Sequence, residues 1–421
     1  MKEFLFSWLK WSKEDWREVI KQIIISGFVA IIFSILTWQV FLIFELMTQL
    51  VLQPEIIVFF VGMVAIVSFL ITTHRNIIHR HQIPAGRESE IRQLVRQIQT
   101  GQSSAVISGF GKERKNILDY LLNKETELFG RQSSNLVFSL LDISRLPKKC
   151  NQSLFWKNAL MPLQEEIAKK SHFAPLAQAF KTCQNNNFEN QYLEKLFVQM
   201  GTHQLRLVLM LHRFEVLLHR PMLNREEFLG GLRLLASSSH PSPLSVIISM
   251  KQSIKQFYQD IEHLIAGSPY LNFMGNITLG ALSDNEIDEL FNQSKQPFDE
   301  EDRVFIKDLS GKHPYLLQIA AACLLEARKD QKKAKNIFDD KIEEMLISIL
   351  RSWDFNTCKA FIHIAHGYDV SGFRNELKEL EKQGFIMNEN NQWRVGSSVF
   401  AELVADKTIQ ELCKNKQSIK N

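Results

Sequence analysis

The residues whose types and spacing suggest chemistry follow a short apolar run, Ala105–Ile107, and read Gly109-Phe110-Gly111-Lys112-Glu113-Arg114-Lys115-Asn116. In the phosphate-loop motif G-x-x-x-x-G-K-[ST], backbone N–H groups wrap the phosphates, the lysine neutralises them and the hydroxyl binds Mg²⁺. Gly109 and Lys115 match this motif without a gap. Arg114 replaces the second glycine, and Asn116 replaces the hydroxyl residue. The segment therefore predicts a strand, a turn and a helix with a degraded phosphate loop.

The two replacements change what this turn can do. Glycine is needed where the backbone approaches phosphate in a conformation that a side chain resists, so Arg114 is expected to strain or open the loop. Its charge could still attract phosphate, whereas Asn116 offers Mg²⁺ only a carbonyl oxygen. An ordinary strand-to-helix turn with solvated basic residues is the alternative.

Short apolar runs separated by helical stretches continue along the chain. Buried strands that alternate with helices are typical of a parallel sheet covered on both faces, so we expect an α/β fold. After Asp339, three helices (340–351, 355–365 and 371–383) and two short strands around an Asn-rich turn indicate a winged helix. The basic run Gln331–Lys335 is expected to be a solvated linker. The apolar runs expected to be strands are Ala105–Ile107, Leu136–Leu141, Leu205–Leu211, Leu244–Ile248 and Ile277–Leu279.

Two uncharged segments near the N-terminus, Ile23–Phe44 and Ile56–Thr73, are each close to the roughly 20 residues that cross a bilayer as a helix. Neither shows the polar stripe of a buried core helix, the alternative interpretation. Lys and Arg flank both segments but are absent from the turn between them, which predicts cytoplasmic ends. We therefore expect a two-helix transmembrane hairpin at 22–73 in the cytoplasmic (inner) membrane. Residues 1–21 are expected to lie along the headgroups as an interfacial helix, or simply to extend the first span.

Composition narrows the function classes. The net charge of +4 over 421 residues builds little field and gives no reason to expect a nucleic-acid partner. The five cysteines have no paired spacing of the kind that zinc or redox sites need. We expect no metal site and propose no nucleophile.

The order of motifs along the chain resembles the bacterial AAA-like branch of the STAND ATPases, which are signal-transduction P-loop NTPases. The motifs are Arg87-Glu88, the degraded loop, Leu209–Glu215, Phe228–Leu235, Ser245–Ser249, Leu279–Ser283 and Gly311–Gln318. This resemblance covers roughly residues 82 to 405. It implies a P-loop NTPase-like domain at 82–282, a helical lid at 283–335, and a winged-helix domain with a C-terminal tail at 336–421.

Carried over to this sequence, the resemblance makes Lys115 the phosphate-loop lysine and Asn116 the occupant of the metal-binding hydroxyl position. His212 stands where the family has an Asp that holds Mg²⁺, and Arg213 stands where an acidic residue activates water. Glu215 lies two positions too late to replace that acidic residue. The remaining positions are Arg87 near the adenine, Gly109 and Gly111 in the loop, Arg114 beside the phosphates, and Gly311 and Pro314 in the lid motif.

These departures imply that hydrolysis is lost, because phosphoryl transfer depends on Mg²⁺ and positioned polar groups. The resemblance then implies a catalytically inactive scaffold or signalling switch, in which ATP or ADP is bound without hydrolysis or the pocket has collapsed. Two different functions stay open beside this one: an active ATPase with unusual site residues, and a membrane-tethered DNA-binding regulator. The expected partners are the lipid bilayer, other proteins, a second copy or an active NTPase. Nucleic acid is not expected, because the third winged-helix helix is acidic.

Overall fold

The computed structural model describes residues 86–405 except for 170, 238–240, 262–269 and 295–296. The interfacial segment predicted at 1–21 and the hairpin predicted at 22–73 lie outside the described residues. Among the helices of the described part, none is both long and apolar enough to cross a bilayer.

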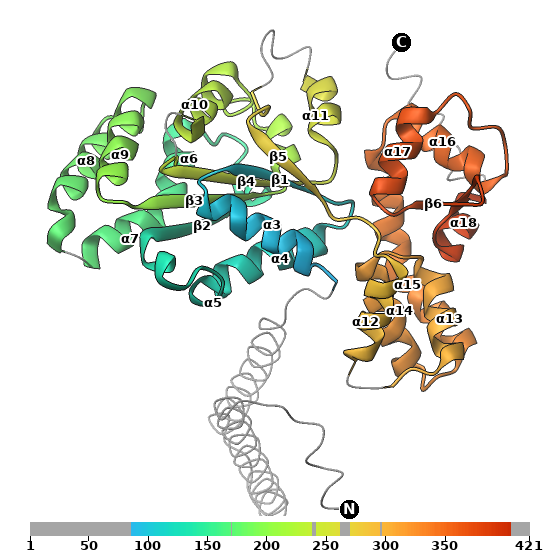
Figure 1. Ribbon diagram of the computed structural model, residues 1–421. Helices are drawn as coiled ribbons and strands as arrows, with labels where there is room; N and C mark the ends of the chain where they lie inside the picture. The colour runs from blue at the N-terminus through green and yellow to red at the C-terminus, as the bar shows by residue number, and fades with distance from the viewer. Residues whose placement is uncertain (1–85, 170, 238–240, 262–269, 295–296, 406–421) are drawn as a thin grey trace, which may run out of the picture. The chain divides into compact units, whose positions relative to one another are not determined.

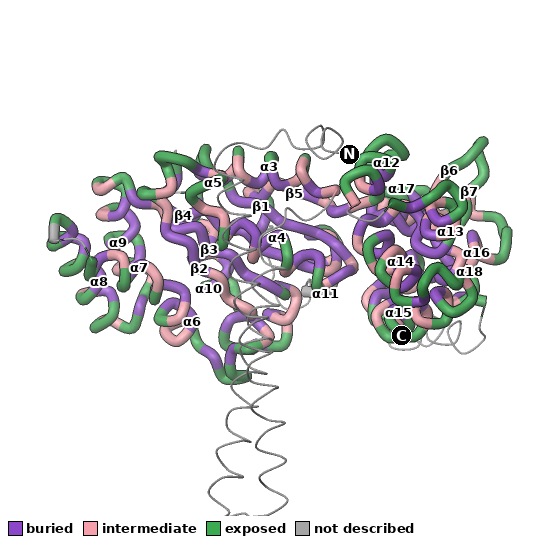
Figure 2. Tube along the Cα trace, turned by 90° about the horizontal axis from the view of Figure 1, so that it is seen from below, coloured by how far each residue is buried: buried purple, intermediate pink, exposed green. Residues whose placement is uncertain are grey.

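A five-stranded sheet forms the centre of the first domain, in the order β2-β3-β4-β1-β5, and every neighbouring pair is parallel. All five apolar runs predicted as strands fall on these strands, so the predicted α/β fold with a parallel sheet is confirmed. β1 and β4 are buried along their whole lengths (Figure 2). The strands are β1 (Ser103–Ile107), β2 (Leu136–Asp142), β3 (Arg206–His212), β4 (Leu244–Met250) and β5 (Met274–Thr278).

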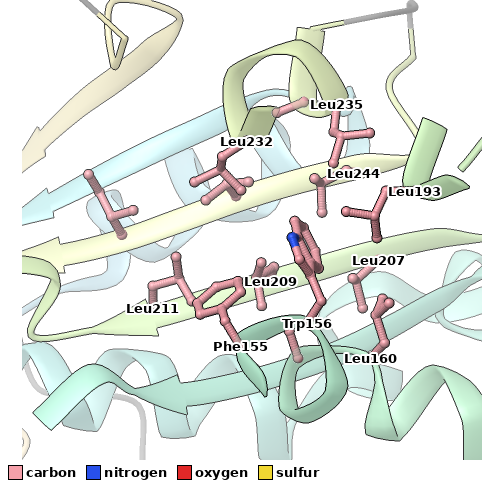
Figure 3. Close-up of a cluster of buried hydrophobic side chains, with 14 of the residues drawn as sticks. Phe155, Trp156, Leu160, Leu193, Leu207, Leu209, Leu211, Leu232, Leu235 and Leu244 are labelled. Carbon is pink, nitrogen blue, oxygen red and sulfur yellow. The ribbon is translucent and has the colours of Figure 1, made fainter. Parts of the chain in front are cut away.

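Helices cover both faces of this sheet (Figure 1). Residues of β3 alternate between them: Leu207, Leu209 and Leu211 enter one core cluster, and Val208 and Met210 enter the other. The larger cluster lies under the helices from α6 to α11, and Figure 3 shows Phe155 and Trp156 of α6 packed over β3. The helices of this domain are α3 (Glu88–Gln99), α4 (Gly111–Asn123), α5 (Glu125–Phe129), α6 (Gln152–Ala159), α7 (Met161–Lys169), α8 (Ala174–Asn185), α9 (Asn190–Thr202), α10 (Glu226–Ser237) and α11 (Ile254–Ile261).

The rest of the described chain is helical apart from one hairpin, in which Asn390 and Asn391 have φ of 52° and 64° and form the expected Asn-rich turn. The solvated linker expected at Gln331–Lys335 is wrong. The side chain of Asp330 accepts a hydrogen bond from the N–H of Lys333, so a long helix starts there. The elements are α12 (Asp284–Asn292), α13 (Glu300–Ser310), α14 (Pro314–Glu326), α15 (Gln331–Ser352), α16 (Phe355–Ala365), α17 (Arg374–Lys382), β6 (Ile386–Glu389), β7 (Gln392–Val395) and α18 (Ser398–Ala405).

These C-terminal elements share one core, and that core reaches the sheet domain at two points. Phe110, in the turn after β1, and Leu282, after β5, both belong to it. The N–H of Leu282 donates to the carbonyl of Lys312 at 2.8 Å. The turn after β1 is therefore packed against residues of 283–335, the segment expected to form a lid and called the lid below.

Candidate functional site

The turn after β1 is shorter than the motif predicts. β1 ends at Ile107 and α4 begins at Gly111, so only Ser108, Gly109 and Phe110 connect them. The Ser108 hydroxyl accepts from the N–H of Phe110 at 3.1 Å and donates to Glu113 at 2.8 Å. The loop expected over Gly109–Asn116 is wrong beyond Phe110, because these bonds close the turn and start the helix.

Glu113 is the centre of a buried polar network. One of its carboxylate oxygens, Oε1, accepts from both Nε and Nη2 of Arg87, at 2.8 and 2.7 Å, and Arg87 is 1% exposed. Arg87 also donates to Glu90 at 2.8 Å and to the carbonyl of Gly280, after β5, at 2.8 Å. Arg87, predicted to lie near an adenine, instead joins α4 to the connection that leads into the lid.

His313 completes this network from the lid. Its Nε2 lies 3.7 Å from a Glu113 oxygen, and its ring centroid lies 4.3 Å from that of Phe110. Burial and the charge of Arg87 hold the pKa of His313 well below its usual value. The imidazole is therefore neutral at pH 7, and its contact with Glu113 is not an ion pair.

Arg114 lies over the beginning of α4. Its guanidinium donates to the carbonyl of Ser108, pairs with Glu215 at 3.5 Å, and has an Nη2 3.7 Å from where a Cβ of Gly111 would be. Burial lowers the pKa of Arg114, and the carboxylates of Glu215 and Glu113 oppose that shift. The guanidinium of the residue that replaces the motif glycine therefore lies beside the N-terminus of α4, the kind of place where helices bind anions.

Lys115 and Asn116 take no part in this arrangement. Because α4 starts at Gly111, both lie in its second turn, where Lys115 pairs with Asp119 and Asn116 is exposed. The predicted phosphate-loop lysine is thus a solvated helix residue.

The end of β3 carries the residues that stand for the missing acidic groups. His212 is 2% exposed, and its Nδ1 lies 2.8 Å from the Ser249 hydroxyl. Burial, together with the charge of Arg114, lowers its pKa to about 4. Arg213 is exposed, and its guanidinium donates to the Ser144 hydroxyl at 3.2 Å. The end of β3 therefore presents a neutral imidazole and an exposed cation.

The lid motif is used for packing. Gly311 ends α13 with φ of 61°, and a Cβ there would lie 2.6 Å from the carbonyl oxygen of Gly396. Pro314 begins α14 and is buried. A Cβ on Gly109 would meet the Phe385 ring at 3.1 Å, so the C-terminal elements close over the loop.

Three residues that build the site, Glu113, His313 and Phe385, were not predicted for it. Only Glu113 carried a signal, as an acidic residue inside a basic phosphate motif. Arg114, Phe110 and Phe385 all lie close to the turn after β1. Over the residues that the structure describes, no three metal-binding side chains come together.

Comparisons with known proteins were made for both sequence and fold. No protein-family model matches the sequence, and no curated protein matches it significantly. The Walker-type ATPase PABY2304 of Pyrococcus abyssi is 15% identical, covers 76% of this chain and 95% of its own, and has a TM-score of 0.47. The ORC2 protein of Aeropyrum pernix, in its ADPNP–ADP complexes, is 11% identical, covers 79% of this chain and 95% of its own, and has a TM-score of 0.45.

The sheet itself defines the fold. Five parallel strands with helices on both faces, and a strand–turn–helix after β1, match the α/β fold of P-loop NTPases.

Proposed function

We propose that this chain is a membrane-anchored protein of the AAA-like branch of the STAND P-loop NTPases that does not hydrolyse nucleotide and acts as a scaffold or signalling switch. The observation that supports this best is the guanidinium of Arg114 at the start of α4. In an intact phosphate loop, that place belongs to a phosphate held by backbone N–H groups. The chain thus puts its own cation where a nucleotide would bring an anion.

The loss of hydrolysis follows from the chemistry at the end of β3. Phosphoryl transfer needs groups that hold Mg²⁺ and orient the nucleophile. His212 is neutral and already bonded to Ser249, and Asn116 faces solvent on α4. Loss of one electrostatic partner of a transition state costs about 2.7–4 kcal/mol, and several are missing here.

The lid contact is the element that a partner would shift. Phe110 lies between the rings of His313, Tyr315 and Phe385, with centroid distances of 4.3, 5.3 and 6.0 Å. A protein partner, a second copy or an active NTPase that binds only the separated lid would favour that state by its difference in affinity. The switch therefore needs no hydrolysis.

The anchor and the C-terminal module complete the proposal. Uncharged residues Ile23–Phe44 and Ile56–Thr73 support a two-span hairpin with both ends in the cytoplasm. We assign α15, α16, α17 and the β6–β7 hairpin to a winged-helix module that serves as a structural arm. Nucleic acid is not its partner in this proposal, because α17 carries Glu376, Glu379 and Glu381.

Nucleotide binding without hydrolysis is the second candidate, and Arg114 is again the observation that favours it. Within the described residues, its Nε and one oxygen of Glu215 lack hydrogen-bond partners. A phosphate could replace Glu215 as the counter-ion if Phe110 moved with the lid. This arrangement would bind ATP or ADP by charge alone, without a metal.

Thermal unfolding of the full chain in phosphatidylcholine nanodiscs separates the two candidates. A ligand that binds only the folded state adds RT ln(1 + [L]/Kd), about 2.7 kcal/mol at a hundred times Kd. We expect no change in the melting temperature with millimolar ATP or ADP, with or without Mg²⁺. A shift that disappears in Arg114→Gln would establish nucleotide binding. A shift that persists in that variant would contradict the role given to Arg114.

A further inference from the structure

Exposed cations gather at the edge of the sheet where the strands end. Parallel strands place all their carboxyl ends at one edge. The segments that follow β2 and β3, together with the first turn of α4 after β1 and the first turn of α11 after β4, carry the cations of this edge. All of them are exposed, and we name them the basic edge: Lys112, Arg145, Lys148, Lys149, Arg213 and Lys255.

The carboxylates at this edge are largely used inside the protein. Glu113 is buried against Arg87, and Glu215 is paired with Arg114. Asp142 accepts from the N–H of Ser144 at 3.0 Å and lies 3.7 Å from Arg145. In the part of the chain that is described, Lys112, Lys148 and Lys149 form no ion pair. Further along, Glu226 and Glu227 at the start of α10 are exposed, and Glu226 accepts from Tyr270.

The spacing of these cations is better suited to a surface that carries many anions than to one bound anion. Neighbouring strands lie about 4.8 Å apart, so the ends of β2, β3, β4 and β1 span roughly 14 Å. Cations with long, exposed side chains over that width can each meet a separate phosphate. Anionic lipid headgroups provide such a surface.

The chain enters the domain at this same edge. Arg87 is bonded to Glu113 at the start of α4 and to the carbonyl of Gly280 after β5. Both partners lie at the carboxyl ends of strands, so Gly86, where the described chain begins, lies at this edge. Residues 74–85 connect this point to the predicted second span, and even fully extended they reach at most roughly 40 Å. The tether therefore keeps the basic edge within reach of the bilayer.

We propose that the basic edge docks on the anionic headgroups of the bilayer that holds the hairpin at 22–73. This inference rests on the membrane anchor of the proposed function. The helices α12 and α13 carry exposed carboxylates in their first turns, Asp284, Glu286, Glu300 and Glu301, of which Asp284 is paired with Lys312. An anionic surface repels these carboxylates while it attracts the basic edge, so charge also sets the orientation.

Lysine acylation tests the docking directly. The full chain is placed in nanodiscs of phosphatidylcholine alone or with phosphatidylglycerol, and acylation rates are read by mass spectrometry. Lys112 and Lys255 report the edge, and exposed Lys378 on α17 is the internal reference. We expect roughly tenfold slower acylation of the two edge lysines in anionic discs, and loss of that protection in about 0.5 M salt, where charges are screened within a few ångströms.

Matched charge variants separate the edge from a general effect of charge. The edge variant changes Arg145, Lys148, Lys149 and Arg213 to Gln. The control changes four exposed cations elsewhere, Lys332, Lys333, Arg351 and Arg374, to Gln. We expect the edge variant to lose the protection of Lys112 and Lys255 and the control to keep it; equal losses in both would overturn the proposal.

Two further outcomes would also overturn it. Equal acylation rates in both kinds of disc, with the chain still resistant to carbonate extraction, would contradict docking of the basic edge but leave the membrane anchor supported. Extraction by carbonate would instead sink the anchor itself. Protection of the edge lysines by duplex DNA in phosphatidylcholine discs, without protection by phosphatidylglycerol, would assign the edge to nucleic acid.

Discussion

The cations at the two halves of the sheet's carboxyl edge lie in opposite environments, buried in one half and exposed in the other. Beside β1 and β5, the cations Arg87 and Arg114 are buried, bonded to carboxylates and covered by the lid. After β2 and β3, Arg145, Lys148 and Arg213 stand in solvent. A buried cation needs a partner within the folded chain, because burying an unpaired charge is costly. An exposed cation is solvated by water and remains available to a partner outside the protein.

This difference explains how a degraded phosphate loop remains folded. Arg114 brings a charge to a helix N-terminus, where a cation is unfavourable, and Glu215 and Glu113 offset it. The β1 half is therefore self-sufficient and needs no ligand. The cations of the β2–β3 half are not buried against carboxylates in this way, so they can interact with molecules outside the protein.

The largest expected effect comes from breaking the buried half at its centre. Glu113→Ala removes the acceptor of two hydrogen bonds from the buried guanidinium of Arg87, which keeps Glu90 and the carbonyl of Gly280 as partners. At about 1.5–3 kcal/mol for each bond to a charged group, we expect a loss of at least about 3 kcal/mol of folding free energy. Urea unfolding measures it, followed by tryptophan fluorescence, to which buried Trp156 and Trp353 contribute. Asp119→Ala, which removes the half-exposed partner of Lys115, is the matched control and should cost less than about 0.5 kcal/mol. Equal losses in the two variants would mean that the network adds nothing.

The pH dependence of the free energy of unfolding tests the buried state of His212 at the end of β3. The pKa of His212 is about 4 in the folded chain against 6.5 for an ordinary histidine, so the unfolded state binds more protons between these values. Stability is therefore fully present above about pH 6.5 and falls as pH falls toward 4, by roughly 3 kcal/mol for this group.

His212→Asn isolates this contribution. Asparagine does not titrate and can still bond the Ser249 hydroxyl, so the fall in stability between pH 6.5 and 4.5 should become shallower. His313, also buried and neutral, leaves a remaining fall in the same direction. His219→Asn, at an exposed position, is the control and should leave the slope unchanged. An unaltered slope in His212→Asn would contradict the buried, neutral state of His212.

The strands of this fold could be predicted because buried parallel strands are continuous apolar runs. The β6–β7 hairpin could be predicted for a similarly local reason, since Asn390 and Asn391 adopt positive φ at little cost. Both signals lie within a few neighbouring residues. The start of α15 differs from the prediction. A basic run is solvated both in a linker and on the surface of a helix, so its composition does not distinguish the two; the local signal for the helix is the N-cap residue Asp330.

The site could not be predicted in the same way, because long-range pairing decides it. The motif fixes which residues follow β1, but the bonds of Ser108 to Phe110 and Glu113 close the turn, and Arg87, 26 positions away in the sequence, holds Glu113 in place. That closure starts α4 at Gly111 and turns Lys115 outward. A single sequence holds no sign of this pairing, nor of Phe385 closing over Gly109.

The smallest expected effect is at Lys115, the residue that the motif marks as most important. Its pair with Asp119 spans one helical turn and is about one-third exposed, so Lys115→Ala should change the free energy of unfolding by no more than about 0.5 kcal/mol. In an active ATPase the same change would abolish phosphate release. We expect no ATP-dependent phosphate release from the wild-type chain in nanodiscs, and none from the variant. Release that is present in the wild type and absent in Lys115→Ala would show that α4 unwinds to rebuild the loop, and the closed β1 half would then be only one of two states.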